Sequence, residues 1–183
     1  MKSIFSSRRS IFPIQFSDKE ITYTQLNELF EAANWAPIHR RTEPWRFKVF
    51  RGDKKTELSH FLVDAYTNTT PKFSKRKSKS IVEKINLSSV VVLICMKRDE
   101  KESVPKWEEI SATAMAVQNL WLKTTELGLG GYWSTPAYIN QIHQFIPLEE
   151  NEKCLGLFYL GGFEGPMPNR EPGDWRKKVQ WFG

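Results

Sequence analysis

The chain of 183 residues has few cysteines, few histidines and no long apolar run. Its most apolar stretch, Val90 to Met96, is far shorter than the roughly 20 residues that a membrane-spanning helix needs, so we expect no membrane association. Cys95 and Cys154 both lie in apolar, strand-like segments, which favours buried thiols in a reducing compartment over a disulfide. Their spacing and the three scattered histidines match no metal-binding pattern, and we predict no metal.

The sequence also lacks internal repeats and recognisable linkers. At this length one domain with a sizeable core is expected, because two full domains would be cramped. We therefore predict a single domain over residues 1–183. Residues 1–16 are basic, contain serine and have no acid, which is also typical of a transit peptide, but they hold the candidate phosphate ligands described below. A cytoplasmic location is the expectation.

Basic residues exceed acidic ones, with 27 Lys and Arg against 21 Asp and Glu. Much of the excess lies in residues 72–79. Such a run occurs on surfaces that bind nucleic acid or anionic lipid, so a basic nucleic-acid-binding module without a cofactor is one hypothesis. The run has one aromatic residue and no zinc or helix-turn-helix spacing beside it. We favour a solvated loop with some helix, and expect no nucleic-acid partner.

Hydrophobic spacing predicts helices interspersed with a few strands. The helices are expected near residues 21–36, 58–65, 107–127 and 140–145, and the strands near 45–51, 89–97, 131–134 and 154–161. Thr22 and Gln25 can form a capping box, Pro37 ends the first helix, and Gly128 is the expected cap of the longest. Long, irregularly spaced helices and few strands favour an α+β fold over a doubly wound one.

Three separated segments carry groups suited to a phosphate and a flat ring. Arg8, Arg9 and Ser10 offer two cations and a hydroxyl, which are frequent phosphate ligands. Residues 36–45 and 130–135 offer backbone and aromatic surface for a planar ring. Flavin mononucleotide (FMN) needs both kinds of contact, so the three segments together outline an FMN site.

The order of these motifs resembles that of the FMN-dependent nitroreductase family, in particular its short, single-domain bacterial members. The motifs are R-R-S at 8–10, A-P followed by P-W at 36–45, G-x-G-G-x-W at 128–133 and L-G-x-F-Y-L-G at 155–161. The resemblance covers residues 4–163. It implies a nitroreductase-like α+β fold, with helices around a central, mostly antiparallel sheet of four to five strands. It also implies a homodimer with FMN at the subunit interface, which would give the aromatic tail, residues 165–183, a surface to pack on.

The resemblance implies roles for individual positions. Residues 8–10 match the family's phosphate and ribityl contacts, whereas Trp35 and His39 match positions that reach the flavin bound mainly by the other subunit. Residues 133–135 match a segment at the start of a strand, beside the ring and phosphate. The implied cofactor-binding residues are therefore Arg8, Arg9, Ser10, Trp35, His39, Trp133, Ser134 and Thr135. We expect His39 to orient FMN or line the substrate slot, and we assign no catalytic residue.

One segment departs from the family's pattern. Ile38, Arg41 and Glu43 stand where members often have Ser, Asn and Gln, so amide partners for the flavin edge are missing. Arg41 either replaces them as a donor or forms a surface pair with Glu43.

The implied function is an FMN-dependent oxidoreductase that takes hydride from NADH or NADPH. By a ping-pong cycle it would reduce a nitroaromatic, quinone or related small-molecule acceptor. Besides the nucleic-acid-binding module, one further alternative keeps the fold and FMN but catalyses reductive dehalogenation or flavin breakdown. The sequence has no readable signature for the preferred nucleotide or the natural acceptor.

Overall fold

The computed structural model describes residues 3–183, which are built around one antiparallel sheet. Among these residues four strands pair in the order β1-β2-β4-β3. Their bounds are β1 (Trp45–Phe50), β2 (Val90–Lys97), β3 (Leu129–Ser134) and β4 (Glu152–Gly162). The α+β fold and the antiparallel sheet expected from the sequence are confirmed.

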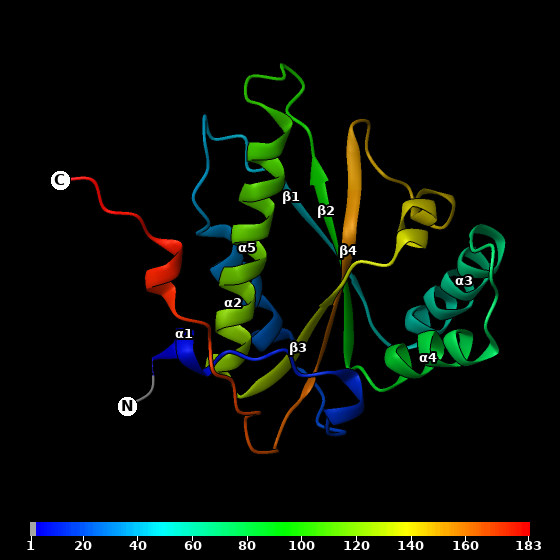
Figure 1. The fold of residues 1–183 in the computed structure, drawn as a ribbon. Helices are drawn as coiled ribbons and strands as arrows, with labels where there is room; N and C mark the ends of the chain where they lie inside the picture. The colour runs from blue at the N-terminus through cyan, green and yellow to red at the C-terminus, as the bar shows by residue number, and fades with distance from the viewer. Residues whose placement is uncertain (1–2) are drawn as a thin grey trace.

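Helices cover both faces of this sheet (Figure 1). The α-helices are α1 (Ile4–Ser7), α2 (Tyr23–Asn34), α3 (Asp53–Thr69), α4 (Lys75–Asn86) and α5 (Lys106–Glu126). The 3₁₀ helices are η1 (Pro13–Gln15), η2 (Ala137–Gln144) and η3 (Trp175–Lys178). In the view of Figure 1, α2 and α5 lie together on one side, whereas α3, α4 and η2 lie on the other.

The central strand β2 is buried on both faces, as its unbroken apolar sequence predicts. Val90, Val92 and Ile94 pack against α2 and α5, in what we call the α5-side core. The intervening Val91, Leu93 and Cys95 pack with α3, α4 and η2, in the α4-side core. The alternation follows from the two-residue period of a strand.

The two helix caps predicted from the sequence, at the start of α2 and after α5, are present in the structure. The Gln25 amide donates to Thr22 Oγ1 at 3.2 Å, and the Thr22 amide donates to Gln25 Oε1 at 3.0 Å. This capping box starts α2 at Tyr23. Gly128 follows α5 with φ of 67°, a left-handed conformation that glycine adopts without strain.

The basic segment 72–79 is more helical than predicted. Ser74 caps α4 by accepting a hydrogen bond from the Lys77 amide at 3.4 Å, so most of the run forms the first turns of the helix. The apolar residues that hold this helix, Ile81 and Ile85, come only after the run. The short helix expected near 140–145 is the 3₁₀ helix η2, and α1, η1 and η3 were not predicted.

Several large apolar side chains are exposed in the single chain. The tail carries Trp175, Trp181 and Phe182, whose exposed fractions are 55%, 81% and 87%. Trp107, at the start of α5, is also largely exposed. None of the helices within residues 3–183 combines the length and the apolar character that crossing a membrane requires.

Candidate functional site

Three arginines gather beside the C-terminal half of α5. The guanidinium of Arg8 stacks on the Trp121 ring, 4.5 Å from its centroid. Its Nη1 atom is buried and has no hydrogen-bond partner within residues 3–183. Burial lowers the pKa of Arg8, and the nearby charges of Arg170 and Arg9 lower it further. A buried donor among like charges is costly, and a bound anion would satisfy it.

Arg9 fixes the chain around this cluster. Its Nε donates to the carbonyl of Pro168 at 2.7 Å, and its Nη1 donates to the carbonyl of Ser6 at 2.8 Å. The bond to Pro168 joins the N-terminal segment to the tail, in which Arg170 lies near Arg8. Ser10 follows and is exposed. The structure therefore places the first three predicted residues together, with Arg170 as a fourth candidate ligand.

The segment after these arginines crosses the free edge of β3. The Ile11 amide donates to the carbonyl of Gly131 at 3.0 Å. The Phe12 ring then lies 4.5 Å from the ring of Tyr132, which packs on the α4-side core. The arginine cluster on the α5 side is thus connected over a few residues to the opposite face of the sheet.

On that opposite face the end of β3 lines a cavity of about 300 Å³. Ser134 and Thr135 are part of its wall, together with lysines from α4. The lining residues are Lys77, Ser80, Ile81, Lys84, Tyr132, Ser134, Thr135, Pro136, Tyr138 and Tyr159. This lining contains no acidic side chain, so the cavity is electropositive. Its volume is at the lower end of the range for small-molecule sites, roughly 300–1,000 Å³.

The α4 lysines are candidate site residues that the sequence analysis missed. Lys84 Nζ lies 5.8 Å from the centroid of the Tyr132 ring. Burial lowers the pKa of Lys84, and the charge of Lys77 lowers it further. Seven positions separate the two lysines, which places them on one face of a helix. That spacing was readable in the sequence, but only after assigning residues 75–86 to a helix.

Residues 133–135 lie at the end of β3, not at the start of a strand as the sequence analysis expected. Ser134 and Thr135 reach the cavity, whereas the Trp133 side chain packs against the α5-side core. Strand alternation places the Trp133 and Ser134 side chains on opposite faces, and Thr135 follows the last residue of β3. Gly156 in β4 permits the close approach, because a Cβ there would lie 2.6 Å from the Ser134 carbonyl oxygen and 2.7 Å from Trp133 Nε1.

His39 lies at the other end of α5, and Trp35 precedes it by four residues, directly after α2. His39 Nδ1 is 2.7 Å from Glu108 Oε2, in the first turn of that helix. Glu108 and Trp121 are thirteen positions apart, which corresponds to about 20 Å along a helix axis. Trp35 is 81% exposed. Within one protomer these two residues are therefore remote from the arginine cluster.

The loop after α2 is unusual in its backbone. Arg40, Arg41 and Glu43 have φ of 51°, 54° and 40°, which side chains other than glycine rarely adopt. No ion pair joins Arg41 to Glu43 within the described residues. Instead, the carbonyl of Glu43 accepts a hydrogen bond from Arg46 Nη1 at 2.9 Å. Trp45 belongs to the core, and its Nε1 donates to Asn34 Oδ1 at 3.2 Å.

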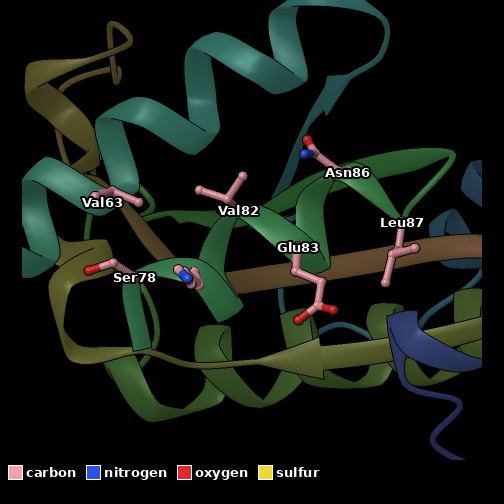
Figure 2. A pocket seen from close by; sticks show the side chains of 7 residues that line it. Val63, Ser78, Val82, Glu83, Asn86 and Leu87 are labelled. Atoms are coloured by element: carbon pink, nitrogen blue, oxygen red, sulfur yellow. The ribbon is translucent and has the colours of Figure 1, made fainter. Parts of the chain in front are cut away.

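A larger groove of about 640 Å³ runs between α3 and α4 (Figure 2). It is lined by Val63, Ser78, Lys79, Val82, Glu83, Asn86 and Leu87. None of the predicted cofactor-binding residues takes part, and Lys79 is its only cation. We therefore place the candidate site at the arginine cluster and the β3 cavity. Among residues 3–183 no group of three or more His, Cys, Asp or Glu could hold a metal ion.

Comparison with known proteins shows the family of the chain and supports the observed fold. The sequence profile of the nitroreductase family matches residues 5–162. The chain belongs to the nitroreductase family. The matched range includes all eight predicted cofactor-binding residues and both α4 lysines, but not Arg170 or the aromatic tail.

Individual nitroreductase relatives are distant in sequence and similar in structure. "Putative NAD(P)H nitroreductase YfhC" of Bacillus subtilis is 27% identical over 164 residues, which is 88% of this chain and 83% of that protein. The crystal structure of a nitroreductase-like family protein from Bacillus cereus has a TM-score of 0.82 at 22% identity, over 98% of this chain and 94% of that one. The FMN-dependent nitroreductase NfnB from Mycobacterium smegmatis, solved in complex with NADPH, has a TM-score of 0.71 at 15% identity, over 98% and 96%.

Proposed function

We propose that this nitroreductase is an FMN-dependent oxidoreductase that uses NADH or NADPH. The observation that carries the proposal is the buried, unpartnered Nη1 of Arg8 in a cluster of cations beside β3. A phosphate monoester supplies several acceptor oxygens that would complete this donor set. The names of the relatives support the same cofactor and donor, because NfnB is FMN-dependent and was solved with NADPH.

In this proposal the two parts of the site hold different parts of FMN. Arg8, Arg9, Ser10 and Arg170 would bind the phosphate on the α5 side of the β3 edge. The cavity bounded by Ser134, Thr135 and the two α4 lysines would hold the ring system. FMN supplies the hydride-transfer chemistry, and the chain supplies binding, orientation and electrostatics.

The lysines give the ring site its electrostatic character. Lys77 and Lys84 place positive charge in a partly buried cavity without an acidic wall residue. A flavin gains negative charge on reduction, so cations here would stabilise the reduced form. The cavity accordingly favours a cofactor that accepts hydride readily from a nicotinamide nucleotide.

We further propose that the active form is a homodimer whose two sites each use both subunits. The reason is the separation of about 20 Å along α5 between the Glu108–His39 pair and Trp121. Trp35 and His39 would contact the FMN held by the arginines of the partner subunit. The exposed tail residues Trp181 and Phe182 would also be covered in such an assembly.

The proposed reaction is a ping-pong reduction of flat acceptors such as nitroaromatics or quinones. Nucleotide and acceptor would enter the same space in turn, because a cavity of this volume does not take both beside a flavin ring. The protein is proposed to act as one cytoplasmic domain. His39 is proposed to orient bound molecules, since it is already paired with Glu108.

The test is reconstitution of the purified protein with FMN. We expect a yellow dimer whose flavin absorbance is bleached by NADH or NADPH without oxygen, and is restored by a nitroaromatic or a quinone. A protein that remains colourless with added FMN but binds DNA or RNA in a salt-sensitive manner would instead support the basic binding module. Flavin that binds but is bleached by neither nucleotide would contradict the proposed donor.

A further inference from the structure

The two cysteines lie directly opposite each other on neighbouring central strands. Cys95 of β2 and Cys154 of β4 are register partners, and both side chains belong to the α4-side core. Opposite residues of an antiparallel pair have Cα atoms about 4.5–5.5 Å apart, within the usual disulfide range of about 4.4–6.8 Å. The backbone therefore already holds the pair at bonding separation, although both thiols are free in this structure.

The sheet is irregular at this point. The β2–β4 register shifts between Ile94 and Cys95, so that Leu155 is the extra residue on β4. A bulge leaves one residue outside the ladder and bends the strand locally. Small adjustments of the two Sγ atoms are easier here than within a regular ladder.

The two thiols differ in their surroundings. Cys154 lines a cavity of about 380 Å³ between η2 and the start of β4, which is also bounded by His143 and Glu149. Cys95 lines none of the cavities described here and is fully buried. A small reagent can therefore reach Cys154 first.

Direct interaction also makes the thiols chemically unequal. The contact with Cys95 lowers the pKa of Cys154, whereas the same contact and then burial raise the pKa of Cys95. Because Cys154 lines the cavity, it is the thiol that peroxide meets first, and Cys95 is the partner that reacts in the second step.

We propose that Cys95 and Cys154 form a peroxide-oxidisable dithiol, separate from the flavin site. The Cys154 thiolate attacks one oxygen of hydrogen peroxide, which breaks the O–O bond, gives a sulfenic acid and releases hydroxide. The Cys95 thiol then attacks that sulfur, the S–O bond breaks and water leaves. Overall, two thiols are oxidised to one disulfide, and the peroxide is reduced to two waters.

The test is titration of the folded protein with hydrogen peroxide, with and without FMN. We expect loss of both thiols, a mass lower by two hydrogen atoms, and one peptide cross-linked through residues 95 and 154. The disulfide should raise the thermal unfolding midpoint by roughly 5–10 °C, because it closes a long loop. Reaction in urea provides the positive control for thiol reactivity.

Two variants separate this route from non-specific oxidation. In Cys154→Ser, which keeps the side-chain volume nearly unchanged, Cys95 should stay reduced, because it lines none of the cavities described here. In Cys95→Ala, Cys154 should go on to sulfinic acid, because no second thiol captures the intermediate. A bulky organic hydroperoxide should react at least about tenfold more slowly than hydrogen peroxide if access is through the cavity.

The inference is overturned if the folded wild type keeps both thiols at peroxide concentrations that oxidise the chain in urea. It is also overturned if Cys154 reaches sulfinic acid in the wild type without a disulfide. Neither result depends on FMN binding, so failure here leaves the proposed function standing, and the reverse also holds.

Discussion

The two ends of α5 carry different kinds of polar site. At the C-terminal half, Arg8 stacks on Trp121 with a buried Nη1 that lacks a partner among residues 3–183. At the N-terminal turn, His39 is exposed and already paired with Glu108. The arginine end thus has a buried donor without a partner, whereas the histidine at the other end already has one. On the proposed function, the arginine end would supply affinity for FMN, and the histidine end would adjust the position of the bound molecules.

The largest expected effect comes from removing the arginine side chains beside the C-terminal half of α5. Arg8→Ala combined with Arg9→Ala should weaken FMN binding by about 100-fold or more, because each charge-assisted hydrogen bond to phosphate contributes about 1.5–3 kcal/mol. Fluorescence titration with FMN measures the loss. The matched control is Arg176→Ala, which removes an exposed arginine of the tail and should leave affinity unchanged. Equal FMN affinity in the double variant would show that the phosphate binds elsewhere.

The next effect concerns β4, which lies against the end of β3 that lines the cavity. Gly156→Ala should destabilise the fold by about 2 kcal/mol, since its Cβ would overlap the Ser134 carbonyl and the core must shift. Chemical denaturation measures this free energy of unfolding. Gly173→Ala is the control, because no atom of the described residues lies within 4 Å of the added Cβ. Similar stabilities for the two variants would mean that the approach at Gly156 is not tight.

At the histidine end, the expected change is in binding rather than in folding. His39→Ala should weaken FMN binding by about tenfold while changing the free energy of unfolding by less than about 0.5 kcal/mol, because the side chain is exposed. His60→Ala, which alters an exposed histidine of α3, is the control. If His39→Ala binds FMN with wild-type affinity, the N-terminal end of α5 is not part of the FMN site.

The smallest expected effect compares two lysines of α4, of which Lys84 lines the β3 cavity and Lys79 lines the α3–α4 groove. Lys84→Met should lower the two-electron reduction potential of bound FMN by about 30 mV, which corresponds to about 1.4 kcal/mol of lost stabilisation of the reduced form. Lys79→Met changes a lysine of the α3–α4 groove and should leave the potential unchanged. Spectroelectrochemical titration gives both values. A larger shift for Lys79→Met than for Lys84→Met would place the ring in the groove.

The sequence predicted the elements whose signals are local. The capping box at Thr22 and Gln25, the glycine after α5 and the apolar run of β2 all depend on residues within one turn or one strand. The basic run was predicted as a solvated loop with some helix, and more of it is helical because Ile81 and Ile85, which fix α4 to the core, lie beyond it. The charge of these residues is typical of a loop, but two apolar residues further along the chain hold the segment in a helix.

The residues of the candidate site were proposed from motifs in the sequence, whereas their arrangement in space was not predictable. The motifs around Arg8 and Ser134 can be recognised in the sequence, and in the structure both lie beside β3. The separation of Trp133 from the cavity depends on strand alternation, and the contribution of Lys84 depends on how α4 packs over β3. The distance between His39 and the arginines depends on the length of α5, which no motif shows.

The most direct test of the shared site is subunit complementation. One chain carries Arg8→Ala with Arg9→Ala, the other carries His39→Ala, and different affinity tags allow the mixed dimer to be isolated. If each FMN uses the arginines of one subunit and His39 of the other, the mixed dimer has one fully intact site. The account predicts one FMN per mixed dimer bound with wild-type affinity. A mixed dimer in which every FMN binds more weakly than in the wild type would contradict it.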